Sequence, residues 1–162
     1  MSSPLALSKL VSPSQLLPVW EVLKHLPAGG VLLGRLAGAM APYTATIRPE
    51  VLTLEKGFAR VRMQDTRRVR NHLNSVHAIA LMNLGEVTTG MAVLTALPEG
   101  LRGIPKRLSM DYLKKARGPL VGQCSCPTVT SLEQQDLEVS AELGNEAGEV
   151  VAVAHATWRI GR

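Results

Sequence analysis

The segment from residue 75 to residue 97 constrains the fold of this chain more than any other, because it reads as one long apolar helix. Its sequence, SVHAIALMNLGEVTTGMAVLTAL, is mostly small or apolar on every helical face, and Pro98 and Gly100 follow it as stop signals. A helix of this kind has to be buried, yet Glu86 lies in its middle. Burying an unpaired carboxylate costs on the order of several kcal/mol, so this side chain requires a partner or a function.

From Tyr43 onward, outside this helix, the hydrophobic period changes from 3.6 residues to two. We expect two strands before the helix and four after it, at about 44–54, 58–69, 106–116, 121–130, 136–143 and 150–160. A sheet this large has one face that must be covered, and only the helix at 75–97 is long enough to cover it. The predicted fold class is therefore α+β, with an antiparallel sheet wrapped around one long central helix.

The first 42 residues read as a helical extension. Ser14 is expected to cap a helix that has Pro18 in its first turn, and a second helix is expected at about 31–40. Within that second helix, one face is bare backbone because glycine recurs every four residues, at Gly30, Gly34 and Gly38. Such a face predicts close packing on a sheet or on another helix. We expect one domain over residues 1–162, with the extension at 1–42 and the core at 43–162.

Composition limits the classes of partner. The net charge is +5, which favours phosphorylated or otherwise anionic partners, but aromatic residues make up only 3% of the chain. Nucleic-acid binding by base stacking requires aromatic side chains among the basic ones, so we expect no nucleic-acid partner. Cys124 and Cys126 point the same way along a strand, which does not favour a disulfide between them. No further metal ligands follow them at a recognisable spacing, so no metal site is expected.

Localisation is predicted to be cytoplasmic. The first ten residues, MSSPLALSKL, have no basic start and no long apolar stretch, so they do not resemble a secretory signal. The apolar segment at 28–42 is too short to span a bilayer and contains Arg35, so no integral membrane segment is expected there.

Three residues in and before the long helix have a spacing that resembles the hotdog-fold thioesterases, in particular the PaaI type and relatives similar to the C-terminal domain of YiiD. Asn71 lies six positions before His77, and Glu86 lies nine positions after it. The order of the predicted elements also matches, over about residues 42–160. The resemblance implies a hotdog fold and a thioester hydrolase. Its substrate would be acyl-CoA or another acyl thioester, with CoA as part of the substrate and no separate cofactor.

The resemblance also implies a role for each residue of the site. The backbone N–H of Ala78 polarises the thioester carbonyl, and Glu86 acts as general base for a water or as the nucleophile. Asn71 orients the water or the carbonyl, and His77 shapes the loop. Where many relatives have Gly-Gly after the histidine, this chain has Ala78-Ile79.

The physical chemistry of the segment agrees with these roles. Asn74 or Ser75 is expected to cap the helix, whose N-terminus carries a partial positive charge that suits a developing oxyanion. His77 and Glu86 are about 13–14 Å apart along the helix and two and a half turns apart, so they face opposite sides. One chain cannot easily bring them to one carbonyl carbon, whereas two antiparallel copies can. We therefore expect a homodimer, or a homotetramer as a dimer of dimers, with composite sites.

A basic cluster after the long helix is a candidate site for the CoA phosphates. It consists of Lys114, Lys115 and Arg117, at the end of the predicted strand 106–116, and lysine and arginine there attract phosphate. Should these residues only solubilise a turn, the next candidates are Arg102, Lys106 and Arg107.

Two alternatives to thioester hydrolysis remain open. A hotdog hydratase or dehydratase also acts on acyl thioesters, but its usual histidine-containing loop is not visible here. A non-catalytic binder of acyl thioesters or fatty acids, with the helical extension as a lid, is favoured by Ala78-Ile79. The other candidate polar residues, His155 and Trp158, are interpreted as a hydrogen-bonded strand residue and a packing residue.

Overall fold

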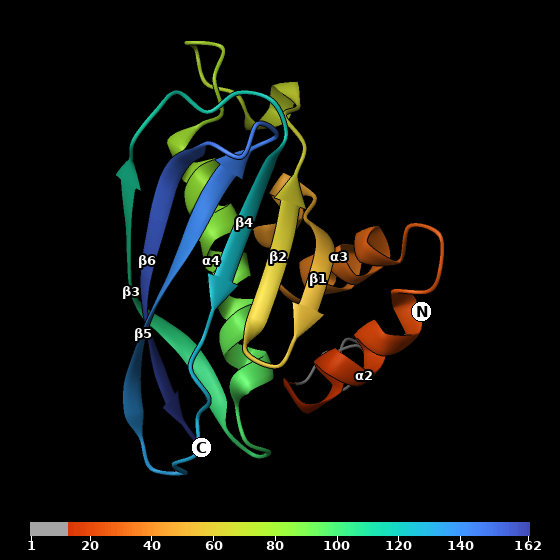
Figure 1. The fold of residues 1–162 in the computed structure, drawn as a ribbon, viewed down its shortest axis with the longest axis vertical. Coiled ribbons are helices and arrows are strands. Elements are labelled where there is room, and N and C mark those ends of the chain that lie inside the picture. Colours follow the sequence, from red (N-terminus) through yellow and green to blue (C-terminus); the bar gives the residue numbers. More distant parts are fainter. Residues whose placement is uncertain (1–12) are drawn as a thin grey trace.

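The computed structural model describes residues 13–162, so residues 1–12 of the predicted helical extension lie outside the described part of the chain. Within it, two helices come first in the chain, and a sheet of six strands then surrounds one long helix (Figure 1). The elements in chain order are α2 (Pro13–Leu23), α3 (Gly29–Met40), the 3-10 helix η1 (Thr44–Ile47), β1 (Glu50–Glu55), β2 (Phe58–Met63), the 3-10 helix η2 (Arg67–Val69), α4 (Ala78–Ala96), β3 (Arg102–Tyr112), β4 (Leu120–Ser125), β5 (Gln135–Asn145) and β6 (Val150–Gly161).

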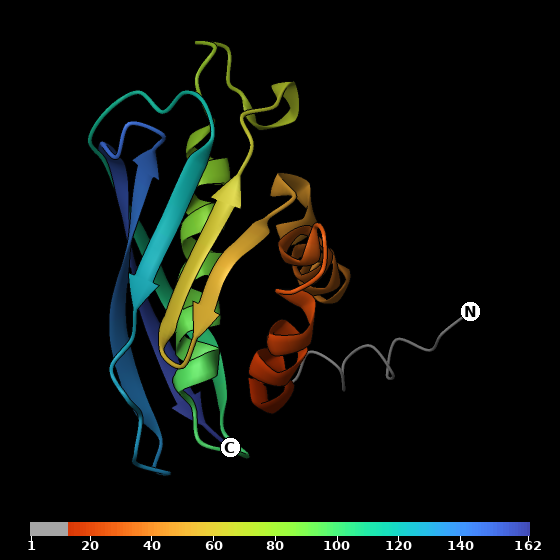
Figure 2. The same ribbon diagram turned by 45° about the vertical axis from the view of Figure 1, so that its right-hand side comes forward.

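The sheet wraps around α4. Its strand order is β1-β2-β4-β5-β6-β3, with every neighbouring pair antiparallel, and all six strands pack against the helix (Figures 1 and 2). Most of α4 from Leu81 onward is buried, and Leu84 and Val93 have no exposed area. The predicted antiparallel sheet around one central helix is therefore confirmed. By length and composition alone α4 could cross a membrane, but here its apolar surface is covered mostly by the strands.

The contact between α4 and the sheet is close because small residues meet across it. A Cβ atom on Gly122 would lie 2.4 Å from the Thr88 hydroxyl oxygen, and one on Gly85 would lie 2.4 Å from the Ala154 Cβ atom. The buried Thr88 hydroxyl donates to the Leu84 carbonyl within the helix at 2.7 Å. Its hydroxyl is thus satisfied without a partner from the sheet, which lets the strands approach.

Two of the predicted strands are wrong at one end. Residues 44–47 form η1 rather than the start of a strand, because Thr46 and Arg48 hydrogen bond back to earlier carbonyls and Arg48 adopts a left-handed conformation with φ of 48°. Likewise, β2 ends at Met63, and the chain turns into η2 where a strand to residue 69 was expected. In residues 44–47 the alternating hydrophobicity begins before the strand does, whereas residues 64–68 are all polar.

Two of the four strands after α4, β3 and β4, depart from their predicted bounds, whereas β5 and β6 lie within two residues of theirs. The strand β3 runs over 102–112 rather than 106–116, so the basic cluster at 114–117 lies in the loop that follows it. The strand β4 ends at Ser125 rather than at 130, two residues before Pro127. A proline has no N–H for a ladder hydrogen bond, which explains why pairing stops there.

The helices α2 and α3 lie beside β1, at one edge of the sheet (Figure 2). Ser14 is inside α2 rather than at its cap, and Pro18 lies in the helix interior rather than the first turn. A proline is unfavourable there, but α2 buries one apolar face that compensates, formed by Leu16, Trp20 and Leu23.

The glycine face of α3 packs as predicted. A Cβ atom on Gly34 would lie 1.7 Å from the Pro49 carbonyl oxygen, and one on Gly30 would lie 2.0 Å from the Val51 carbonyl oxygen. The carbonyl groups of Pro49, just before β1, and Val51, within it, leave no space for side chains at these two positions. The helix α3 therefore packs closely on β1 and covers this edge of the sheet. The opposite edge is β3, and in residues 13–162 no second helix covers it beside α4 (Figure 1).

Replacing Gly34 with Ala is expected to lower the free energy of unfolding by about 1–3 kcal/mol, because the new methyl group overlaps a backbone carbonyl that cannot move easily. Urea denaturation of the purified protein measures this. The control is Gly144→Ala, whose Cβ atom would have no neighbour closer than 3.7 Å. Equal stabilities of the two variants would contradict the close packing of α3 on β1.

Candidate functional site at the start of the central helix

The loop before α4 is built around the side chain of Asn71. Its Oδ1 atom accepts hydrogen bonds from the Leu73 N–H at 2.9 Å and from both the N–H and the hydroxyl of Ser75 at 3.2 Å. Asn74 completes this turn in a left-handed conformation with φ of 55°. The Nδ2 atom of Asn71 has no partner in the described part of the chain. Asn71 therefore shapes the loop with its oxygen and has an amide donor left for a ligand.

The helix begins later than expected. The cap residue is His77, not Asn74 or Ser75, and its Nδ1 atom accepts a hydrogen bond from the Ile79 N–H at 3.1 Å. The chain cannot become helical earlier, because the His77 N–H donates to the Val69 carbonyl at 2.7 Å and so holds this segment extended. An accepting Nδ1 carries no proton, so the neutral imidazole has its proton on Nε2. His77 thus caps the helix and holds the end of the loop, and its role in a reaction stays a prediction.

The capped helix start presents backbone donors. Within residues 13–162 the N–H groups of Ala78 and Ala80 have no hydrogen-bond partner, whereas that of Ile79 is used by the cap. These donors lie at the positive end of the dipole of α4. A cavity of about 340 Å³ adjoins the helix start, and its lining comes from three segments: Tyr43, Thr46, Ile47, Arg68, Val69, Arg70, His77, Ile79, Ala80 and Asn83. The site can therefore donate hydrogen bonds to an oxyanion beside a cavity.

Asn83 positions one wall of this cavity, and the sequence analysis missed it. Its side chain is buried, and its Nδ2 atom donates to the Tyr43 carbonyl at 3.0 Å and to the Thr46 hydroxyl at 3.2 Å. These contacts hold η1 over the first turns of α4. A polar amide in an otherwise buried helix was the available signal, because buried amides need partners.

Glu86 lies on the one stripe of α4 that the sheet leaves partly open. Helical spacing places it on the same face as Met82 and Ile79, and Ile79 is 50% exposed. The Glu86 carboxylate is half-buried and has no hydrogen bond or ion pair in the described part of the chain. Burial raises the pKa of this carboxyl above its usual value. Asn71, His77 and Ala78 thus lie at the start of α4 and in the loop before it. Within one chain, Glu86 lies nine residues after His77 along the helix.

The basic cluster after β3 is only partly free. Lys114 pairs with the exposed Glu149, whereas Lys115 and Arg117 are exposed and unpaired within residues 13–162. The neighbours of Arg117 are tied to the loop before α4. The Gly118 N–H donates to the Asp65 carboxylate at 2.8 Å, and the Ala116 carbonyl accepts from the Val76 N–H at 2.9 Å.

A larger hollow of about 740 Å³ lies on the outer face of the sheet and is lined in part by Ser140 and His155. Ser140 hydrogen bonds to His155 Nδ1 at 2.8 Å, and His155 Nε2 is 3.1 Å from a carboxylate oxygen of Asp111. These residues come from three neighbouring strands, and all three side chains are exposed on the outer face of the sheet. The predicted hydrogen bond of His155 is present, and it belongs to the sheet surface. Trp158 is buried and packs as predicted.

Glu86→Gln is expected to stabilise the protein at neutral pH. Burial raises the pKa of Glu86, so the folded state favours the protonated form and ionisation above that pKa lowers stability. The amide removes this penalty at pH 7, and the gain should disappear as pH falls below the raised pKa. Urea unfolding at several pH values measures the difference, with the exposed Glu55→Gln as control. A destabilised Glu86→Gln variant at pH 7 would show that the carboxylate has a favourable partner.

Comparison with solved structures supports the predicted fold. A structural-genomics target is 28% identical, with a TM-score of 0.77 over 92% of this chain and 97% of that one. A probable thioesterase of unknown function from Pseudomonas aeruginosa is 23% identical, with a TM-score of 0.72 over 84% and 96% of the two chains. A point mutant of the phenylacetic acid degradation protein PaaI from Thermus thermophilus is 19% identical, with a TM-score of 0.62 over 73% and 97%.

These neighbours confirm the hotdog fold and the resemblance to PaaI-like thioesterase structures. At such identities the likeness concerns the fold and carries no residue roles. No curated protein matches the sequence. A family model described as "Domain of unknown function (DUF4442)" matches residues 29–160, which is most of the chain. The chain therefore belongs to the DUF4442 family and has a hotdog fold.

Proposed function

We propose that this protein hydrolyses acyl thioesters, with acyl-CoA as the substrate class, at sites shared between two copies of the chain. The observation that carries the proposal is Glu86. A half-buried carboxylate with no partner in residues 13–162 costs stability, and thioester hydrolysis gives it a use as a base with a raised pKa. The neighbouring solved structures named as thioesterases support the same reaction class.

The proposed reaction uses two groups. The Ala78 N–H donates to the thioester carbonyl oxygen and stabilises the negative charge that develops there. Glu86 accepts a proton from a water as the water oxygen attacks the carbonyl carbon, or it attacks that carbon itself and the acyl-enzyme is then hydrolysed. The carbon–sulfur bond breaks, and the products are a carboxylic acid and a thiol. The free amide donor of Asn71 is suited to orient the water or the carbonyl.

A second copy brings the two groups to one carbonyl. The strand β3 is long and forms one edge of the sheet. In residues 13–162 no helix covers this edge in the way that α3 covers β1. The side chain of Ile104 on this strand is 63% exposed, and that of Leu113, just after the strand, is 57% exposed. Unpaired edges of this kind favour pairing with another strand. The Tyr112 hydroxyl, on the same strand, donates to the Ala78 carbonyl at 3.2 Å. A partner that pairs along β3 would thus lie near the start of α4.

A non-catalytic acyl-thioester binder is the second candidate. It would use the same cavity and the same helix start, and the side chains of Ala78 and Ile79 favour it, because they narrow the approach to the N–H donors. Hydrolysis of any member of a panel of acyl-CoAs, lost in Glu86→Gln, would exclude it.

Ala78→Pro is expected to lower kcat by about 10²–10³-fold, because proline removes the N–H that polarises the carbonyl. Proline is tolerated at the first position of a helix, and the extended conformation of His77 suits a residue that precedes proline. The helix should therefore remain intact, which circular dichroism checks. Glu86→Gln should remove most of the activity as well. Near-normal turnover in either variant would refute the corresponding role.

Mixing these two inactive variants tests whether sites are shared. If Glu86 of one copy works with Ala78 of its partner, each heterodimer has one intact site, and re-equilibrated mixtures should regain about a quarter of the wild-type activity. Each variant alone serves as the control. Recovery of no activity, with dimer exchange verified by sedimentation, would argue for sites formed within one chain.

A further inference from the structure

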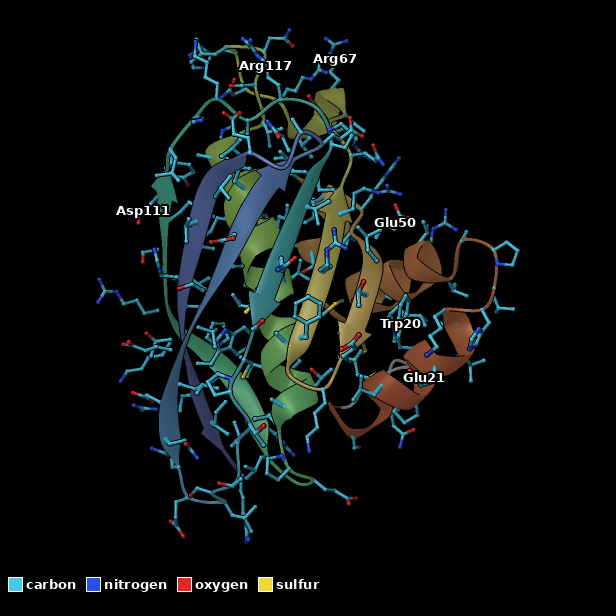
Figure 3. The ribbon with its side chains drawn as sticks, in the orientation of Figure 1. Trp20, Glu21, Glu50, Arg67, Asp111 and Arg117 are labelled. Carbon is cyan, nitrogen blue, oxygen red and sulfur yellow. The ribbon has the colours of Figure 1, made fainter. Side chains whose placement is uncertain are left out.

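Four basic side chains around the candidate site make no ion pair within residues 13–162. They are Arg67 and Arg68 in η2, and Lys115 and Arg117 in the loop after β3; we call them the basic rim. All four are exposed, and Arg67 and Arg117 lie at the same end of the molecule in Figure 3. Two cations adjacent to the rim in sequence are neutralised, since Arg70 pairs with Asp65 and Lys114 pairs with Glu149.

Asp65 joins the two halves of the rim. One carboxylate oxygen accepts from Arg70 at 2.7 Å and the other accepts from the Gly118 N–H at 2.8 Å. Burial alone would raise the pKa of Asp65, but the hydrogen bonds from Arg70 and Gly118 outweigh it and the pKa is lowered. An ionised Asp65 thus ties the segment that precedes Arg67 to the residue that follows Arg117. Two segments about fifty residues apart in sequence form one surface.

The basic rim borders the cavity at the start of α4. Arg68 lines this cavity together with His77 and Ala80, beside the free backbone donors. A ligand whose reactive carbonyl lies at the Ala78 N–H can therefore extend through the cavity mouth to the rim. The required ligand has a neutral arm at one end and several negative charges at the other.

We propose that the basic rim binds the diphosphate and the 3′-phosphate of a CoA thioester, so that the enzyme selects CoA thioesters over those attached to a carrier protein. This rests on the proposed thioester hydrolysis. The CoA end group carries about four negative charges at neutral pH, which matches the four unpaired cations of the rim. The phosphopantetheine arm of a carrier protein brings a single diester phosphate and would leave most of the rim unneutralised.

The experiment measures binding of CoA to the full-length protein by calorimetry at low and high salt. The double variant Arg67→Gln with Arg117→Gln should weaken binding about tenfold at low salt and less at high salt. The control removes the same net charge elsewhere, by Arg35→Gln on α3 with Arg60→Gln on β2, and should change the affinity less than about twofold. Wild-type protein should bind 3′-dephospho-CoA more weakly than CoA, and this difference should shrink in the rim variant.

Three results would overturn the proposal. If the rim variant and the wild type bind CoA with equal affinity, the phosphates bind elsewhere. If both double variants lose the same CoA affinity, the loss comes from net charge alone. Faster hydrolysis of a carrier-protein thioester, lost in the rim variant alone, would assign the rim to an acidic carrier.

An acyl-pantetheine thioester has no phosphate and separates this proposal from the reaction itself, because its hydrolysis should be unaffected by the rim variant. If neither this thioester nor acyl-CoA is hydrolysed, the proposed function fails, whereas CoA binding still tests the rim.

Discussion

Burial of α4 by six strands is the constraint on which the rest of the structure depends. The helix is apolar around nearly all of its circumference, so the sheet has to curl to cover it, and glycines on both sides allow the contact to be close. Two parts of α4 escape this cover, namely its first turn and the stripe that carries Glu86. Every chemically useful feature of the helix is found in one of these two parts. The site is thus the portion of the core helix that the sheet does not reach.

The sequence predicted the architecture well because the architecture follows from periodicity. A long helix without a polar face and a run of alternating strands leave few other arrangements, and the glycine face of α3 was readable for the same reason. The ends of elements were predicted less well, because they depend on single hydrogen bonds. Asn71 closes a turn that delays the helix to residue 77, and a left-handed Arg48 keeps residues 44–47 out of β1.

Contacts between segments that are distant in the chain could not be predicted from the sequence. Nothing in the residue pattern indicates that Lys114 is neutralised by Glu149, or that Asp65 joins the loops before and after the core helix. The role of the segment between α3 and β1 was also hidden. Through Asn83 and the backbone of Tyr43, this segment forms a wall of the cavity at the helix start. It therefore contributes to the candidate site, and its sequence bears on which ligands fit.

The strand order has a consequence for how the chain acquires its structure. The strand β6 follows all other strands in sequence, yet in the sheet it lies between β5 and β3 and provides the only strand partner of β3 among the described residues. During synthesis α4 and β3 leave the ribosome well before β6, so the long apolar helix has an incomplete cover until β6 has been synthesised. Non-local pairing of this kind folds slowly and exposes hydrophobic surface meanwhile. The nascent chain should therefore depend on chaperones until β6 has paired with β3.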